Sequence, residues 1–278
     1  MICVFSKRIK EVIKMKQCVV LVTGGSSGIG KATAEALRDA GCKVYEGSRR
    51  ESIISGIIHI PLDVTDEASV RSAVEQIVSD DGRLDVLVNC AGSGISGAVE
   101  FTSDDEAKKQ MDINFFGTVN MAKAAIASMR ENGGGRIVNI SSVAATFPIP
   151  FQAYYSASKA AINAWSLALA NELKPFGISV TAVQPGDIKT GFTAARAKSA
   201  SGDDVYGGRI SRSVAKMEHD EENGMSAETA GRMIAKIALK KQVKPLYTLG
   251  VSYKLLCLAG KIMPVSFSNK LVGSMYSK

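Results

Sequence analysis

The sequence predicts a single α/β domain, a doubly wound parallel sheet of about seven strands with helices on both faces. Short apolar runs of strand length alternate along the chain with longer segments of helical periodicity, the pattern of βαβ units. A glycine-rich turn at residues 24–30 follows the first apolar run and opens the first helical segment. Hydrophobic residues make up 46% of the 278, which is enough to bury one large core.

Each predicted element is placed by its residue pattern. The apolar runs that predict strands are residues 18–23, 43–47, 57–60, 84–88, 136–140, 178–183 and 245–250. The periodic segments that predict helices are residues 31–41, 66–79, 103–131, 153–173 and 226–241. The chain therefore divides into a basic N-terminal extension (1–16), the domain (17–250) and a basic, amphipathic C-terminal extension (251–278).

The turn after the first strand suits a pyrophosphate. Its glycines let backbone N–H groups approach phosphates, and the N-terminus of the following helix adds positive potential. The alternative is a glycine-rich turn without a ligand, since the spacing Gly-x-x-x-Gly-x-Gly differs from the commonest dinucleotide fingerprint. We expect a Rossmann dinucleotide site at Gly24, Ser26, Ser27, Gly28, Ile29 and Gly30.

The end of the second strand indicates which dinucleotide binds. An acidic residue there bonds the ribose 2′-hydroxyl of NAD, whereas an arginine accommodates the 2′-phosphate of NADP. Ser48 stands at the acidic position and Arg49 and Arg50 follow it, so NADP(H) is the predicted cofactor. Glu46 lies two residues too early for the ribose role, although it is the residue that weighs against this preference.

Two further strand ends suit a nucleotide. Asp63 and Val64 follow the third strand, where Asp63 could bond the adenine amino group or simply cap the loop before the next helix. Asn89, Ala91 and Gly92 form a tight turn after the fourth strand, and its small residues let a ribose approach closely. We therefore expect these residues to contact the cofactor as well.

Residues 141–159 bring together a hydroxyl, a phenol and an ammonium. Tyr155 and Lys159 are four apart on a predicted helix, so they share one face, and the ammonium is expected to lower the pKa of the phenol toward neutrality. A phenol tuned in this way could act as a general acid or base. Ser142 follows a strand and could hold a substrate oxygen beside Tyr155. Asn114, within the 103–131 segment, is either a packed polar group or a local helix break that holds a water.

Charge and composition exclude several classes of function. The net charge of +7 comes from both ends of the chain, and no acidic residue follows Glu228. The basic residues are scattered among aliphatic ones, which does not favour nucleic acid and fits a solvated rim, anionic substrates or weak membrane contact. Five cysteines without paired spacing indicate reduced thiols and a cytoplasmic location. Two histidines and no Cys/His cluster predict no metal, and no stretch is long and apolar enough to span a bilayer.

These motifs together resemble the classical short-chain dehydrogenase/reductase family over residues 18–190. The resemblance rests on TGGSSGIG (23–30), DV (63–64), NCAG (89–92), Asn114, Ser142, YSASK (155–159) and PGDIKT (185–190), with Cys90 and Gln184 as small departures. It implies that Tyr155 exchanges the substrate proton, Lys159 bonds the nicotinamide ribose, Ser142 binds the substrate oxygen and Asn114 holds a relay water. It also implies cofactor contacts from the loop after the sixth strand, at Pro185, Gly186, Ile188 and Thr190, and a homodimer or homotetramer.

Four segments are expected to line the substrate pocket: residues 93–99, 144–154, 187–225 and the C-terminal extension. Phe147, Ile149 and Phe151 make the second segment apolar, which predicts a bulky hydrophobic alcohol or ketone as substrate. Residues 187–225 are long for a loop and rich in Ala, Ser and Gly, so we expect a lid. The C-terminal extension resembles that of short-chain enzymes acting on steroids and lipid alcohols. Its candidate roles are covering the pocket, joining a subunit interface or resting on lipid, and we favour the first two.

The predicted function is an NADP(H)-dependent oxidoreductase that interconverts a secondary alcohol and a ketone on a hydroxysteroid, a bile acid or a related lipid. An alternative is a 3-oxoacyl-thioester reductase, because basic residues could dock an acidic carrier protein. A non-enzymatic alternative is a nucleotide-sensing regulator, although the complete set of catalytic residue types weighs against it.

Overall fold

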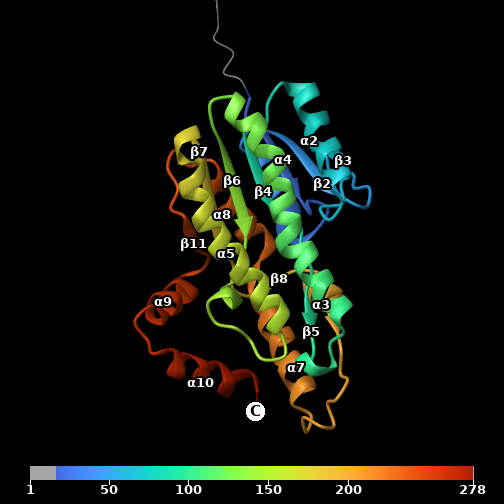
Figure 1. Ribbon diagram of the computed structural model, residues 1–278, viewed down its shortest axis with the longest axis vertical. Helices are drawn as coiled ribbons and strands as arrows, with labels where there is room; N and C mark the ends of the chain where they lie inside the picture. The colour runs from blue at the N-terminus through green and yellow to red at the C-terminus, as the bar shows by residue number, and fades with distance from the viewer. Residues whose placement is uncertain (1–16, 278) are drawn as a thin grey trace, which may run out of the picture.

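The computed structural model describes residues 17–277, and the predicted N-terminal extension at 1–16 lies outside the described residues. Its centre is a parallel sheet of seven strands in the order β11-β7-β6-β4-β1-β2-β3 (Figure 1). The strands are β1 (Val19–Thr23), β2 (Lys43–Ser48), β3 (Ile58–Pro61), β4 (Val86–Asn89), β6 (Gly135–Ile140), β7 (Ile178–Gln184) and β11 (Leu246–Thr248). All seven predicted strands are present, and the predicted doubly wound fold is confirmed.

Helices cover both faces of this sheet (Figure 1). One face packs against α2 (Glu67–Asp81), α4 (Gly117–Glu131) and α5 (Ala153–Leu173). The other face packs against α1 (Gly28–Asp39) and α8 (Ala227–Ala238). Because both faces are covered, the central strands are rich in Val, Ile and Leu, and all five residues of β1 are buried. The order of strands changes direction on either side of β1, which leaves a crevice at the carboxyl ends of β1 and β4.

The helix expected at residues 103–131 is interrupted. It consists of α3 (Asp104–Met111), a π-helical turn (Asp112–Phe116) and α4. The wider π turn points Asn114 inward, where the residue is fully buried. The two interpretations of Asn114 are therefore both met in part, because the helix is locally broken and the side chain is packed and hydrogen-bonded inside the protein. The relay water that Asn114 is expected to hold stays a prediction.

The segment expected to be one long loop at 187–225 is largely ordered into short elements. These are β8 (Ile188–Lys189), α6 (Phe192–Ala195), β9 (Ala197–Lys198), α7 (Arg209–Glu222) and β10 (Met225–Ser226). The strand β8 pairs with β10, and β9 pairs with β5 (Ile95–Ser96). The helix α7 buries Ile210 and Met217, an apolar stripe that the many charged residues between them conceal in the sequence.

The C-terminal extension folds into two helices, α9 (Val251–Gly260) and α10 (Val265–Tyr276), which lie beside and below the sheet in Figure 1. Cys257 and Val272 pack on Val143 and Phe147 in a third, smaller apolar cluster. Within residues 17–277, no helix combines the length and the apolar character needed to cross a membrane.

Candidate active site

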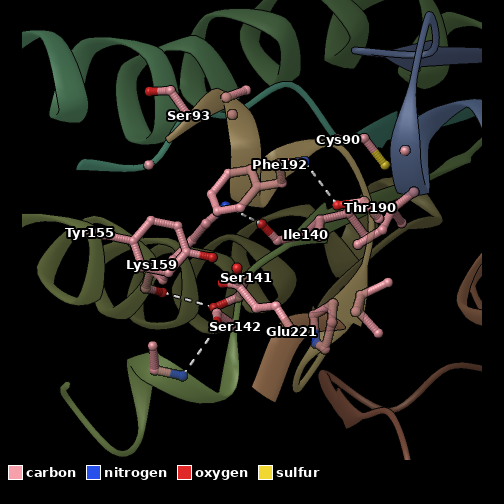
Figure 2. Close-up of a pocket in the computed structure, with 18 of the residues that line it drawn as sticks. Cys90, Ser93, Ile140, Ser141, Ser142, Tyr155, Lys159, Thr190, Phe192 and Glu221 are labelled. Atoms are coloured by element: carbon pink, nitrogen blue, oxygen red, sulfur yellow. Dashed lines mark hydrogen bonds between the residues drawn. The ribbon is translucent and has the colours of Figure 1, made fainter. Parts of the chain in front are cut away.

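A cavity of about 1340 Å³ opens at the carboxyl ends of the parallel strands. Sites for drug-sized molecules occupy about 300–1,000 Å³, so this space suits two ligands side by side. The glycine turn and the second strand line one end. Ser142, Tyr155 and Lys159 line the middle (Figure 2), and the extension lines the other end.

The cradle at the end of β1 admits only glycine at two positions. A Cβ atom on Gly30 would lie 2.2 Å from the carbonyl oxygen of Gly24, and a Cβ on Gly24 would lie 2.9 Å from the Cα of Ala91. Gly24 also has a φ of 67°, in the left-handed region. Thr23 ties this turn to the next one, because its hydroxyl accepts hydrogen bonds from the N–H groups of Cys90 and Ala91 at 3.1 and 3.0 Å.

The first turn of α1 presents backbone donors to the cavity. Ser27 is its N-cap residue but makes no side-chain capping bond, so the leading N–H groups of the helix are available to an anion. Gly28 lies close to Thr190, since a Cβ on Gly28 would be 3.5 Å from the Cβ of that residue. All six residues predicted for the phosphate turn line the cavity: Gly24, Ser26, Ser27, Gly28, Ile29 and Gly30. The arrangement fits a dinucleotide pyrophosphate.

The end of β2 supplies positive charge to the same cavity. Ser48, Arg49 and Arg50 line it, and both arginines are exposed. Glu46 is buried on the strand and accepts hydrogen bonds from His59 and Ser52. Glu46 does not line the cavity. One oxygen of the carboxylate that weighed against an NADP preference is therefore hydrogen-bonded within the fold, away from the cavity.

The residues predicted after β3 and β4 divide into two groups. Asp63, Val64, Ala91 and Gly92 line the cavity. The carboxylate of Asp63 accepts hydrogen bonds from the backbone and hydroxyl of Thr65, which lower the pKa of Asp63. Asn89 instead turns into the protein and donates to Asn139 Oδ1 at 2.9 Å, so it supports the turn and does not line the cavity.

Tyr155 stands on the first turn of α5 and faces the cavity beside Ser142 (Figure 2). Burial raises the pKa of Tyr155 to about 12, while hydrogen bonding with Ser142 acts in the opposite direction. Ser142 is held by a hydrogen bond that its hydroxyl accepts from Ala144 N at 3.1 Å. The ring of Phe192 lies over Tyr155, with 5.9 Å between the ring centroids.

Lys159 lies one helical turn further along α5. Its ammonium donates to the carbonyl of Ile140 at 2.9 Å and stands 5.7 Å from the centroid of the Tyr155 ring. Burial lowers the pKa of Lys159 to about 8. The prediction that Lys159 brings the pKa of Tyr155 toward neutrality is therefore wrong for the protein by itself, because burial disfavours the charged form of both groups.

Asn114 supports the catalytic residues from behind. Its Oδ1 accepts from Ser93 N at 2.8 Å, and its Nδ2 donates to Ser93 O at 3.1 Å and to Ser158 Oγ at 3.0 Å. Asn114 does not line the cavity. It lies close behind Gly92, where a Cβ atom would be 3.3 Å from Asn114 Oδ1 and 3.7 Å from Lys159 Nζ. The residue thus links the Gly92–Ser93 turn to α5.

Two of the three predicted substrate residues reach the cavity. Phe147 and Ile149 line it, and Phe147 is buried against α9. Phe151 does not line it: its backbone turns into the left-handed region at a φ of 60°, and its ring packs edge-on against Tyr206 at 5.5 Å. The prediction that Phe151 binds the substrate is therefore wrong, because its ring packs on Tyr206 outside the cavity lining.

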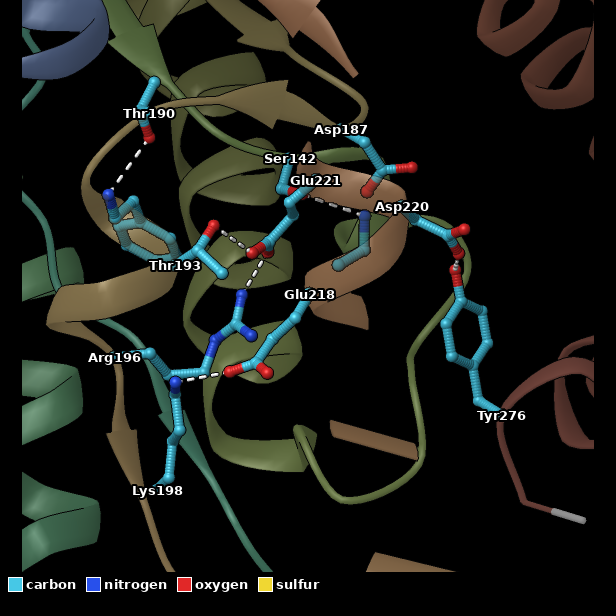
Figure 3. Close-up of polar contacts among 12 residues, drawn as sticks. Ser142, Asp187, Thr190, Thr193, Arg196, Lys198, Glu218, Asp220, Glu221 and Tyr276 are labelled. Atoms are coloured by element: carbon cyan, nitrogen blue, oxygen red, sulfur yellow. Dashed lines mark hydrogen bonds and ion pairs between the residues drawn. The ribbon is translucent and has the colours of Figure 1, made fainter. Parts of the chain in front are cut away.

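The cavity also has an acidic wall, and Asp187, Asp220 and Glu221 line it (Figure 3). Glu221 pairs with the buried guanidinium of Arg196 and accepts from Thr193 at 2.6 Å. Asp220 pairs with Lys216 and accepts from Tyr276 at 3.1 Å. Asp187 accepts a hydrogen bond from Tyr253 but forms no ion pair with a basic side chain within the described part of the chain. Asp187 was not singled out as a site residue, although it lies three residues after the end of β7 and begins the segment expected to line the pocket.

The C-terminal extension completes the cavity. Its lining residues are Ser252, Tyr253, Leu256, Leu271, Val272, Met275 and Tyr276. The ring of Tyr253 lies so close to Gly186 that a Cβ there would be 2.1 Å from it. The remaining predicted residues of this loop, Pro185, Ile188 and Thr190, also line the cavity. The expectation that the extension covers the pocket is therefore met by its place in the structure.

Comparison with known proteins adds a family to this geometry. Residues 18–201 match the family model for the short chain dehydrogenases. The chain is 45% identical over 230 residues, 82% of its length, to the 3-ketodihydrosphingosine reductase of Bacteroides thetaiotaomicron, of which 86% is covered.

Solved structures show the same fold. A short-chain dehydrogenase from Streptomyces avermitilis superposes with a TM-score of 0.76 at 30% identity, covering 92% of this chain and 95% of the other. The NADP-bound structure of ElxO superposes with a TM-score of 0.72 at 28% identity, covering 86% of this chain and 99% of the other.

Proposed function

Because the chain belongs to the short-chain dehydrogenase family, we propose that it is an NADP(H)-dependent reductase of a long-chain amino ketone of the 3-ketodihydrosphingosine type. The family membership accounts for an oxidoreductase that acts on ketones and secondary alcohols with a nicotinamide cofactor. The choice of NADP(H) is supported by Arg49 and Arg50 at the end of β2 and by the hydrogen-bonded carboxylate of Glu46.

The observation that carries the substrate class is Asp187. It is a carboxylate that lines the cavity, and it forms no ion pair of its own among residues 17–277, whereas Glu221 pairs with Arg196 and Asp220 pairs with Lys216. These two cations act on Asp187 only from a distance and lower its pKa less than burial raises it. Burial raises the pKa of Asp187 itself, so a cationic partner would offset the cost of its charge. 3-Ketodihydrosphingosine carries an ammonium on the carbon next to its ketone, whereas steroids and bile acids carry no cation.

The apolar part of the cavity suits a long alkyl chain. Phe147 and Ile149 line it together with Leu256, Val272 and Met275 of the C-terminal helices, and Phe147 packs in one cluster with Val272 and Leu256. A chain bound there would extend from Ser142 toward α9 and α10. The 45% identity to a reductase named for this substrate supports the same proposal.

The residues of the site have distinct tasks in the proposed reaction. The cofactor supplies the hydride when it is bound. The hydroxyl of Ser142 orients the ketone oxygen, and the phenol of Tyr155 gives its proton to that oxygen as the alcohol forms. The pKa of about 12 keeps Tyr155 protonated and ready to donate at neutral pH. Lys159 places a positive charge next to the resulting phenolate, and Phe192 excludes water from above Tyr155.

A substrate panel tests the proposal. Purified enzyme is assayed with NADPH and with NADH on 3-ketodihydrosphingosine, its N-acylated form, a ketosteroid, a bile-acid ketone and an acetoacetyl thioester. We expect the highest kcat/KM with NADPH and the free amine. A higher value on a steroid or bile acid would return the substrate to the class predicted from the sequence, and a higher value on the thioester would favour a 3-oxoacyl-thioester reductase. No turnover on any of them would favour a nucleotide-sensing regulator.

Two further properties are part of the proposal. A cytoplasmic location is supported by the free thiols of Cys18, Cys42, Cys90 and Cys257. A homodimer or homotetramer stays a prediction, for which sedimentation velocity is the measurement. The absence of a metal also stays a prediction, tested by elemental analysis of the purified protein.

A further inference from the structure

The outer faces of α9 and α10 form an exposed apolar surface, which we call the tail surface. Val251, Leu255 and Leu258 follow one another at spacings of a helical turn, so α9 presents them on a single face, and Ile262 follows in the turn after α9. Val265 and Phe267 continue the surface at the start of α10. These are large side chains in contact with solvent, with Ile262 at 87% and Val265 at 81% of their full exposure. Eight of the 17 exposed large hydrophobic side chains among residues 17–277 fall within the two helices and the turn between them.

Positive charges flank this apolar face. Lys254 on α9 and Lys261, the C-cap residue that follows α9, are seven residues apart and exposed, so both lie along one flank of the face. Lys270 is exposed on α10. No acidic residue occurs after Glu228. A helix pair with apolar side chains on one face and only lysines beside it is typical of segments that lie in the headgroup region of an anionic bilayer.

The opposite faces of the same helices are anchored to the body of the protein. Cys257 and Val272 pack on Val143 and Phe147, and Tyr276 bonds Asp220 of α7. The inner side chains Leu256 and Val272 line the catalytic cavity, and so do Leu271 and Met275 at the exposed rim of α10. The tail surface is therefore a rigid continuation of the cavity wall.

We propose that the tail surface docks the protein on an anionic lipid bilayer, with the apolar side chains inserted and the three lysines on the headgroups. A second copy of this chain fits the surface less well, because a two-fold interface would bring lysines against lysines with no carboxylate of these helices between them. Docking would place the cavity mouth at the membrane. The passage of a lipid ketone from the bilayer into the cavity rests on the proposed function, whereas the docking itself does not.

Vesicle flotation of the full chain tests the docking. One set of vesicles is phosphatidylcholine alone, and the other is two parts phosphatidylcholine to one part phosphatidylglycerol. We expect flotation with the anionic vesicles and much less with the neutral ones. The variant Lys254→Gln/Lys261→Gln/Lys270→Gln should bind the anionic vesicles about 100-fold more weakly, since each lysine near such a surface contributes about fivefold.

The matched control is Lys123→Gln/Lys174→Gln/Lys236→Gln, which removes the same charge from exposed positions elsewhere. It should bind as the wild type does, and an equal loss in both triple variants would overturn the proposal. The variant Leu258→Gln/Ile262→Gln tests the apolar part, with an expected loss of at least about tenfold.

Two other measurements keep the outcomes distinct. If Leu258→Gln/Ile262→Gln changes the sedimentation coefficient of the vesicle-free protein and leaves flotation unchanged, the tail surface is a subunit interface and the proposal is wrong. Turnover of detergent-solubilised 3-ketodihydrosphingosine, measured without vesicles, reports on the proposed function alone. Flotation without turnover would support the docking and contradict the proposed function. Turnover without flotation would support the proposed function and contradict the docking.

Discussion

Tyr253, in α9, donates a hydrogen bond from its phenol to the carboxylate of Asp187, in the loop after β7. This contact joins the C-terminal extension to the edge of the sheet where the chemistry takes place. The extension therefore shapes the active site itself, and the acidic group that suits a substrate amine is positioned by a residue that lies 66 positions further along the chain.

The first prediction concerns that carboxylate. Asp187→Asn keeps the size of the side chain and removes its charge, so kcat/KM for 3-ketodihydrosphingosine should fall about 10- to 100-fold. The N-acylated substrate, which has no ammonium, is the matched control and should change less than about threefold. Equal losses on the two substrates would show that Asp187 has no part in recognising the amine.

The second prediction concerns the packing of Tyr253. Gly186→Ala places a methyl group 2.1 Å from the Tyr253 ring, so the start of α9 should be displaced, at a cost of about 1–3 kcal/mol in the free energy of unfolding. Hydrogen exchange of residues 251–276 should become faster. Gly191→Ala is the control in the same loop, because nothing lies within 4 Å of a Cβ at that position. If both variants exchange alike, the contact does not hold the extension.

The third prediction concerns the proton donor. Tyr155→Phe removes the phenolic hydroxyl and should lower kcat by about 10²- to 10⁴-fold, while NADPH binding and the melting temperature stay close to those of the wild type. Tyr154→Phe, at the neighbouring position outside the cavity lining, should keep full activity. Activity in Tyr155→Phe comparable to the control would exclude Tyr155 as the acid.

The fourth prediction is a dependence of stability on pH. Burial lowers the pKa of Lys159 from its ordinary 10.5 to about 8. Between pH 8 and pH 10.5 the unfolded chain therefore holds a proton on Lys159 that the folded chain has released. Below pH 8 the buried charge of Lys159 destabilises the fold, and this effect disappears as the pH rises toward 10.5. Lys159→Met should raise the free energy of unfolding at pH 7 by up to about 3 kcal/mol, and the gain should shrink at about pH 10.

Urea denaturation at the two pH values is the measurement. Lys236→Met removes an exposed lysine from α8 and should show little difference from the wild type at either pH. A gain for Lys159→Met that is the same at both pH values would mean that the charge of Lys159 is not the cause.

The fifth prediction concerns the cofactor. Arg49→Ala should raise KM for NADPH about 10- to 100-fold and leave KM for NADH nearly unchanged, since only NADPH carries the 2′-phosphate. Arg71→Ala, an exposed arginine on α2, is the control. An unchanged ratio of the two KM values would remove Arg49 from the phosphate site.

Much of the fold and the reaction could be predicted from local patterns. The seven strands follow from apolar runs, because a parallel sheet covered on both faces needs continuous hydrophobic segments. The glycine turn was identifiable from its place between a strand and a helix. Gly30 is required by contact with Gly24, six residues away, whereas the close approach of Gly24 to Ala91 appears only in the folded chain. The spacing of Tyr155 and Lys159 placed both on one face of a helix, as α5 shows.

What the sequence by itself determined is this local set: the sheet, the phosphate turn and the pair on α5. Tertiary structure alone decided the rest, since those properties depend on residues far apart in the chain. The pKa values of Tyr155 and Lys159 follow from burial, and the outward turn of Phe151 accompanies its packing on Tyr206. Asp187 is left without an ion pair because Arg196 and Lys216 pair with Glu221 and Asp220 of another segment. The spacing of residues in the sequence determines the geometry of one helix or one turn. Burial and charge pairing depend on segments that meet only when the whole chain has packed.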